Sequence, residues 1–190
     1  YPFPTGRGEP AAASGWVVRE ESTYLQLFAR APKEARYLGD AGTWYLAEPG
    51  TAERIQTYSP DARIIVILRH PAERAYSAWC HARCDGEEPL ADFTDALAAE
   101  SERQSPSHLL RYRAMGQYAR QLRPYLDTFG RERVLILRYE DLRDSANALW
   151  RECLLFLDLD PSLPAPTAHH QNRSGMPRSR LLQRLLKHEG

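Results

Sequence analysis

The sequence predicts a three-layer α/β fold in which helices flank a parallel sheet. Residues 63–69, RIIVILR, and residues 132–142, ERVLILRYEDL, each contain a continuous run of aliphatic side chains. Such runs are typical of strands that are buried on both faces of a parallel sheet. Each run ends in an arginine and is followed by a helix pattern, and this alternation favours an α/β fold. With 190 residues and 43% apolar side chains, the chain is long enough for one domain.

The segments before the first strand have weaker patterns. Residues 1–20 are rich in proline, glycine and alanine, which indicates a loop. We expect a short helix in residues 22–30, where a serine or threonine can cap the N-terminus. Residues 35–46 predict an extended piece interrupted by glycines, and residues 50–60 predict a short helix that ends at a proline.

The segments after the first strand are mainly helical. The helix that follows this strand runs to about Cys84, and residues 90–101 form another. Residues 108–130 have apolar side chains at three-to-four spacing and predict one long amphipathic helix. Residues 145–159 are strongly helical, and a last helix begins near Pro177 after a polar, glycine-containing loop.

Charge and hydropathy exclude some classes of partner. The 25 basic and 25 acidic side chains balance, so net charge gives no reason to expect nucleic acid or an anionic membrane surface. No run approaches the ~20 apolar residues of a membrane span, and no secretory signal is visible, so we expect a cytoplasmic protein. Lys33 and Lys187 are the only lysines, which leaves few candidates for a catalytic lysine.

The cysteines and paired histidines do not predict a metal site. Cys80 and Cys84 lie four residues apart on a predicted helix, but a second pair of ligands at suitable spacing is missing. Together with Cys153 they make an odd number, and we interpret all three as ordinary, partly buried thiols. His169 and His170 lack a third ligand. No metal is therefore expected.

The end of the first strand carries the clearest functional signal. In open parallel sheets, ligands lie beyond the carboxyl ends of the strands, and Arg69 lies at such an end. A guanidinium binds phosphate with two parallel hydrogen bonds, and Ser77 on the next helix can donate to the same anion. The first turn of that helix adds backbone N–H groups. The alternative is that Arg69 pairs with Glu73 while Ser77 only fills a helix face.

Residues 64–79, IIVILRHPAERAYSAW, resemble the 3′-phosphate-binding segment of sulfotransferases that use 3′-phosphoadenosine 5′-phosphosulfate (PAPS). The similarity continues through GDAGTWYL, through residues 112–142 and into NRSGMPRSRLLQRLL, and it is closest to bacterial enzymes and heparan-sulfate-type domains. The resemblance implies a P-loop-NTPase-like sheet, with Arg69 and Ser77 on the 3′-phosphate.

A late basic loop closes over the nucleotide in this family. By order along the chain it corresponds to NRSGMPRS, which implies that Arg173, Ser174 and Gly175 contribute to the cofactor site. The arrangement of Tyr112, Gly116 and Tyr118 is more typical of helix packing than of ligand contact. We likewise interpret RYEDLR as structural, with Glu140 or Asp141 capping a helix or pairing with arginine.

One expected part of the family pattern has no counterpart. The family begins with a strand and a glycine-rich loop that cradles the 5′-phosphosulfate, and its position would precede Tyr1. We therefore expect residues 1–190 to be a single sulfotransferase-like domain that lacks this strand and loop. Whether these 190 residues are active on their own stays open.

The catalytic base has two candidates. GRGEP resembles the stretch whose glutamate acts as general base in the heparan-type branch, which implies Glu9. A glycine, Gly8, stands where the family has lysine, and a solvated loop glutamate is the alternative. His70 is a rival because it lies beside Arg69, although an imidazolium with a structural role fits equally well.

The function implied is transfer of a sulfuryl group from PAPS to a hydroxyl or amine of a small-molecule or carbohydrate acceptor. The alternative is a truncated or degenerate module that binds nucleotide or a partner without catalysis. A P-loop kinase relative is disfavoured because a Walker-type loop and a magnesium carboxylate are missing. We expect acceptor specificity in residues 85–89 and around Trp44; the sequence names neither the acceptor nor an oligomeric state.

Overall fold

The computed structural model describes residues 20–104 and 107–166, and the chain forms two compact units, Tyr1–Thr43 and Trp44–Gly190. The described part of the first unit contains helix α1, Glu21–Gln26, which confirms the helix expected there. Its N-cap residue is Glu20, without a side-chain cap, so the expected serine or threonine cap was wrong. The Tyr24 hydroxyl donates to Asp40 at 3.3 Å.

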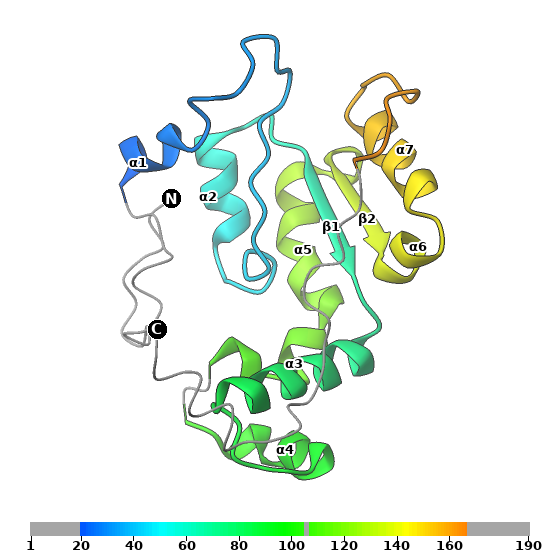
Figure 1. The fold of residues 1–190 in the computed structure, drawn as a ribbon. Coiled ribbons are helices and arrows are strands. Elements are labelled where there is room, and N and C mark those ends of the chain that lie inside the picture. Colours follow the sequence, from blue (N-terminus) through cyan, green and yellow to red (C-terminus); the bar gives the residue numbers. More distant parts are fainter. Residues whose placement is uncertain (1–19, 105–106, 167–190) are drawn as a thin grey trace, which may run out of the picture. The chain divides into compact units, whose positions relative to one another are not determined.

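The second unit contains a parallel pair of strands, β1 (Ile64–Leu68) and β2 (Val134–Arg138) (Figure 1). The register pairs Ile64 with Val134 and continues to Leu68 with Arg138. Both strands fall where the apolar runs predicted them, which confirms an α/β chain with a parallel sheet. The described residues hold only these two strands, so the complete three-layer arrangement stays a prediction.

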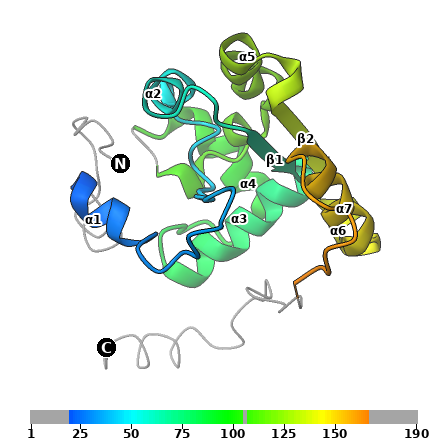
Figure 2. The same ribbon diagram turned by 90° about the horizontal axis from the view of Figure 1, so that it is seen from above.

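Helices pack on both sides of these strands (Figure 2). Helices α2 (Thr51–Tyr58) and α5 (Tyr118–Phe129) enclose one core with β2, built on Ala52, Tyr125, Phe129 and Val134. Helix α7, Ala146–Phe156, packs Leu149 and Cys153 against Leu137 on the other side. Because successive side chains alternate across a strand, the aliphatic run of β2 serves both cores.

Strand β1 is less enclosed than its composition predicts. Ile65 and Ile67 are 37% and 47% exposed, whereas their neighbours Ile64, Val66 and Leu68 are half-buried. The prediction that β1 is buried on both faces was therefore wrong in the structure described. Helix α7 packs on Leu135 and Leu137 of the neighbouring strand and leaves the side chains of β1 on that face accessible.

Both strands lead into helices at their carboxyl ends (Figure 1). Strand β1 is followed by α3, Pro71–Asp85, which begins with proline at its first position and ends at Gly86 with φ +81°. Proline suits the first turn because that turn needs no N–H donor, and glycine tolerates the left-handed cap. Strand β2 is followed by α6, Tyr139–Asp144. Helix α4, Phe93–Ala98, starts at Asp92, whose carboxylate accepts from two backbone N–H groups.

The single long helix predicted for residues 108–130 was wrong. The segment forms two 3-10 turns, His108–Leu110 and Ala114–Gly116, before α5 begins at Tyr118. The Glu100 carboxylate accepts from the backbone N–H groups of Arg113 at 2.6 Å and Ala114 at 3.1 Å. These amides are thereby unavailable for helical hydrogen bonds, and a tertiary contact overrides the local periodicity.

A buried carboxylate joins α3 to the segment that follows α4. Glu88 is 1% exposed and accepts from the Tyr112 hydroxyl at 2.6 Å, from Arg103 at 2.7 Å and from the Leu90 N–H at 2.9 Å. Burial disfavours the charged form, but these hydrogen bonds outweigh it and lower the pKa of Glu88. Arg83 on α3 donates to the Glu88 carbonyl at 2.7 Å. Glu88 thereby connects the segments that carry Leu90, Arg103 and Tyr112 to the end of α3.

Cys80 and Cys153 are buried, and Cys84 is half-buried. Within residues 20–104 and 107–166, no helix combines the length and apolar composition needed to cross a bilayer.

Replacing Glu88 by glutamine should destabilise the chain by about 3 kcal/mol, because the mostly buried Arg103 guanidinium loses its charged partner. Because the folded state lowers the pKa of Glu88, its contribution is fully present above the ordinary value of 4.5 and is lost as pH falls through the lowered one. Urea unfolding should therefore show a large difference in unfolding free energy between the wild type and the Glu88 variant at pH 7, and a smaller difference at pH 3. The exposed neighbour Glu87, changed to glutamine, should stay within about 0.5 kcal/mol. Equal losses in both variants would contradict the role of the buried carboxylate.

Candidate nucleotide and acceptor site

The strand register continues past the ends of the strands and determines which residues meet there. Leu68 pairs with Arg138, so Arg69 lies beside Tyr139, with its guanidinium carbon 5.4 Å from the ring centroid. One residue further, the His70 N–H donates to the Glu140 carboxylate at 2.9 Å. The turn from β1 into α3 is thus tied to the start of α6.

A second tie comes from α5. The Tyr118 hydroxyl donates to the carbonyl oxygen of Arg69 at 2.9 Å, and burial raises the pKa of this tyrosine. The hydrogen bond from the His70 N–H is the main reason why the pKa of Glu140 is lowered. The structural roles expected for Tyr118 and for the RYEDLR segment are therefore confirmed, and Asp141 pairs with Arg138 at 3.2 Å.

The Arg69 side chain forms the ion pair that the alternative interpretation named. Its Nε lies 3.2 Å from the Glu73 carboxylate, and the two side chains are 34% and 52% exposed. An exposed pair of this kind contributes only about 0–1 kcal/mol, because solvent screens it. A phosphate that offers several charged oxygens can therefore compete with Glu73 for the guanidinium.

Ser77 lies on the same face of α3 as Glu73, because residues four positions apart are neighbours on a helix. Since Arg69 contacts Glu73, the guanidinium and Ser77 lie on one side of this helix. Ser77 is half-buried. The structure thus brings the two predicted phosphate ligands to the same side of α3, with Glu73 between them.

The N-terminus of α3 is a further source of positive potential. His70 is its N-cap residue, and no side chain caps this end, so the helix presents its first-turn N–H groups at the strand exit. The His70 residue is exposed. Its role as base stays a prediction.

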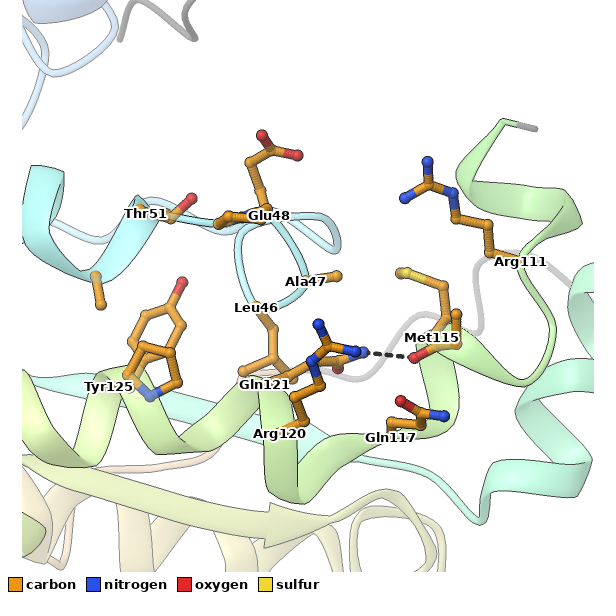
Figure 3. A pocket seen from close by; sticks show the side chains of 15 residues that line it. Leu46, Ala47, Glu48, Thr51, Arg111, Met115, Gln117, Arg120, Gln121 and Tyr125 are labelled. Carbon is orange, nitrogen blue, oxygen red and sulfur yellow. Dashed lines mark hydrogen bonds between the residues drawn. The ribbon is translucent and has the colours of Figure 1, made fainter. Parts of the chain in front are cut away.

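A cavity of about 380 Å³ lies between residues 46–52 and the segment that ends in α5 (Figure 3). Arg111 and Arg120 extend toward this space from different elements, and Glu48 stands opposite Arg111. At its floor, the Gln121 amide donates to the Ala114 carbonyl at 3.0 Å. Beneath Thr51, the Tyr125 hydroxyl donates to a backbone carbonyl at 2.5 Å, and burial raises the pKa of Tyr125 to about 12.

Several predicted site residues lie outside the described residues. They are Glu9, the candidate base, and Arg173, Ser174 and Gly175 of the late loop. Their roles stay predictions. Residues 85–89 were expected to determine acceptor specificity. Within them, Glu88 is buried and takes part in the hydrogen-bonded network described above.

Comparison with known proteins shows the family of this chain. Residues 10–162 match the family described as "Sulfotransferase family". The chain belongs to this sulfotransferase family. A crystal structure of a sulfotransferase from Alicyclobacillus acidocaldarius is 36% identical, with a TM-score of 0.77 over 90% of this chain and 70% of that one. The resemblance stated from residues 64–79 is therefore confirmed.

The curated relatives of this sulfotransferase are much longer. The human bifunctional heparan sulfate N-deacetylase/N-sulfotransferase 2 is 31% identical over 108 residues, which are 55% of this chain and 12% of the relative. Mouse carbohydrate sulfotransferase 15 is 29% identical over 127 residues, 58% of this chain and 23% of the relative. The chain thus spans less than a quarter of the length of either.

Sequence reasoning missed the residues that line the cavity. Arg111 and Arg120 fall in the segment predicted as one continuous helix, where polar positions would face solvent. The chain breaks before Tyr118, where the carboxylate of Glu100 accepts from the backbone N–H groups of Arg113 and Ala114. Only an unusual signal, a glycine at position 116 inside an apparent helix, pointed to an interruption.

Replacing Tyr118 by phenylalanine removes the donor to the Arg69 carbonyl and should lower the free energy of unfolding by about 1 kcal/mol. Chemical denaturation measures this loss. Tyr76 on α3 is the matched control, because it is 51% exposed, and its change to phenylalanine should have little effect. An unaltered unfolding midpoint in the Tyr118 variant would show that the hydrogen bond contributes nothing.

Proposed function

We propose that this sulfotransferase transfers the sulfuryl group of PAPS to a hydroxyl or amine of a carbohydrate or small-molecule acceptor. The observation that carries the proposal is Arg69, which leaves β1 on the same side of α3 as Ser77 and beside the uncapped N-terminus of that helix. Guanidinium, hydroxyl and helix N-terminus together suit a phosphate dianion. In this proposal they hold the 3′-phosphate of the donor.

The residues present fit such a group chemically. The Arg69 backbone is fixed by the Tyr118 hydroxyl, and the next N–H is fixed by Glu140, so the strand exit is rigid before a ligand arrives. Its guanidinium contacts exposed groups, the Glu73 carboxylate and the Tyr139 ring. A fixed backbone with a replaceable side-chain partner limits the ordering cost of binding.

The reaction proposed is an in-line displacement at sulfur. The bond between sulfur and the phosphate oxygen of the donor breaks, and a bond from sulfur to the acceptor oxygen or nitrogen forms. The acceptor proton passes to a base, for which Glu9 and His70 are the candidates, and adenosine 3′,5′-bisphosphate leaves. Positive groups such as Arg69 stabilise the departing bisphosphate, and binding orients the reactants.

A sugar acceptor is favoured by the relatives. The names of the human and mouse relatives contain heparan sulfate and carbohydrate, respectively. We extend this acceptor class to the present chain as part of the proposal. We also retain the three-layer, P-loop-like architecture as the expected fold, which the similarity to the bacterial sulfotransferase supports.

The 3′-phosphate assignment is tested by calorimetric titration with adenosine 3′,5′-bisphosphate and with 5′-AMP. The bisphosphate should bind more tightly, and Arg69→Ala should weaken it by ~1.5–3 kcal/mol, roughly ten- to hundredfold. Arg138 ends the neighbouring strand, is exposed and has its own carboxylate partner, so Arg138→Ala is the matched control. Equal affinity for the two nucleotides would sink the proposal. Unfolding of the Arg69 variant, with bisphosphate affinity retained in whatever remains folded, would assign Arg69 a structural role.

Glu73→Gln should have the opposite effect on affinity. Removing the carboxylate frees the Arg69 guanidinium and takes a negative charge from the first turn of α3, so bisphosphate should bind up to about fivefold more tightly. The same titration measures the change. Weaker binding in this variant would mean that Glu73 orients Arg69 for the ligand and does not compete with it.

A further inference from the structure

We propose that the arginine-lined cavity beside α5 binds the acceptor, and that this acceptor is an acidic oligosaccharide carrying carboxylate or sulfate groups. The inference rests on the proposed function, because it assigns the second substrate of the same reaction. The charge of the cavity, its shape and its position next to the strand exit support this assignment.

The cavity carries a net positive charge. Arg111 and Arg120 both line it, both belong to exposed residues, and neither forms an ion pair with any residue in the described ranges. Glu48 is the cavity's acidic residue, which leaves an excess of one positive charge. Unpaired guanidiniums that face a common space are suited to carboxylate and sulfate groups, which accept paired hydrogen bonds.

The start of α2 adds to this potential. Gly50, Thr51 and Ala52 line the cavity, and Gly50 is the N-cap residue, with φ +74° and no side-chain cap. The Thr51 hydroxyl is already an acceptor for Arg54 at 2.9 Å and does not cap the helix. The positive end of α2 therefore supplements the two arginines on the opposite wall.

The shape favours a chain of sugar rings over a single small anion. A second cavity of about 370 Å³ adjoins the first, and the two share Arg111, Ala114 and Gln117 as lining residues. The second also contains Arg113, whereas the carboxylate of its Glu100 is occupied by backbone N–H groups. Each volume falls within the range of ordinary ligand pockets, and two adjoining cavities offer room for more than one sugar ring.

An exposed indole lies next to the loop that lines this site. Trp44 is 45% exposed, and its ring lies 4.9 Å from that of His108, in the 3-10 turn next to Arg111. The Glu48 N–H bonds to the Trp44 carbonyl at 3.1 Å, which ties the indole to the cavity loop. A flat apolar surface beside cationic and amide groups suits the C–H face of a sugar ring.

The wall of the cavity also contacts the strand exit. Ala114 and Met115 line the cavity, and a Cβ added to the next residue, Gly116, would lie 3.2 Å from Pro71, the first residue of α3. Tyr118, two residues further, bonds to the Arg69 carbonyl. The segment between 114 and 118 therefore separates an acceptor cavity from the proposed 3′-phosphate site by little more than its own thickness.

The test uses two tetrasaccharides of equal length: alternating glucuronate and N-acetylglucosamine, and neutral chitotetraose. Titrated into the 190-residue chain, the acidic one should bind at least about tenfold more tightly. Arg111→Gln and Arg120→Gln should each weaken the acidic probe by roughly three- to tenfold, and the double variant by more. Arg123→Gln is the matched control, because Arg123 is exposed on the same helix and does not line the cavity.

Adenosine 3′,5′-bisphosphate is titrated into the same variants, where its affinity should be unchanged. Equal binding of the two tetrasaccharides, an unaffected double variant, or an equal loss in the Arg123 variant would overturn the acidic-sugar site. If that site survives but the wild type does not distinguish bisphosphate from 5′-AMP, the proposed function fails and with it the acceptor role. If the nucleotides are distinguished and the sugars are not, only the present inference fails.

Discussion

The parallel pairing of β1 and β2 is the constraint on which the rest of the site depends. Because Leu68 is opposite Arg138, the next two residues of each strand meet in the same order, Arg69 with Tyr139 and His70 with Glu140. A slip of one residue would exchange the faces of every side chain and separate these pairs. The backbone register thus places Arg69, the proposed phosphate ligand, at the strand exit.

Two sets of polar groups support this register, one at the strand exit and one buried near the end of α3. Tyr118 and Glu140 hold the backbone at the strand exit, and both leave the Arg69 guanidinium free to change partner. Just beyond the C-terminal end of α3, the buried Glu88 carboxylate accepts hydrogen bonds from Tyr112 and Arg103. Buried hydrogen-bonded networks of this kind hold elements in one relative orientation, and this one ties the end of α3 to the segment that forms the cavity wall.

The sequence contained most of the fold and half of the site. Both strands and the helices that follow them were predictable, because their apolar periodicity and their caps are local signals; Pro71 and Gly86 mark α3 at both ends. The order of strand, arginine and helix predicted that Arg69 and Ser77 lie on the same side of α3, and their role on a phosphate stays a proposal. The solvent exposure of Ile65 and Ile67 was not predictable, because it depends on which strand α7 covers. The arginines of the cavity were not predictable either, because the turns before α5 depend on tertiary contacts such as the one with Glu100.

That carboxylate, Glu100, has a consequence for anyone who redesigns this protein. Residues 108–130 carry the periodicity of an uninterrupted helix, and the hydrogen bonds of the Arg113 and Ala114 amides to Glu100 favour the interrupted form. Substitutions chosen to raise helical propensity there would improve local consistency and remove the bend. The wall that faces Glu48 would straighten, and Tyr112, which this segment contributes to the buried core, would be displaced with it. A continuous helix in this segment would therefore remove the proposed acceptor cavity.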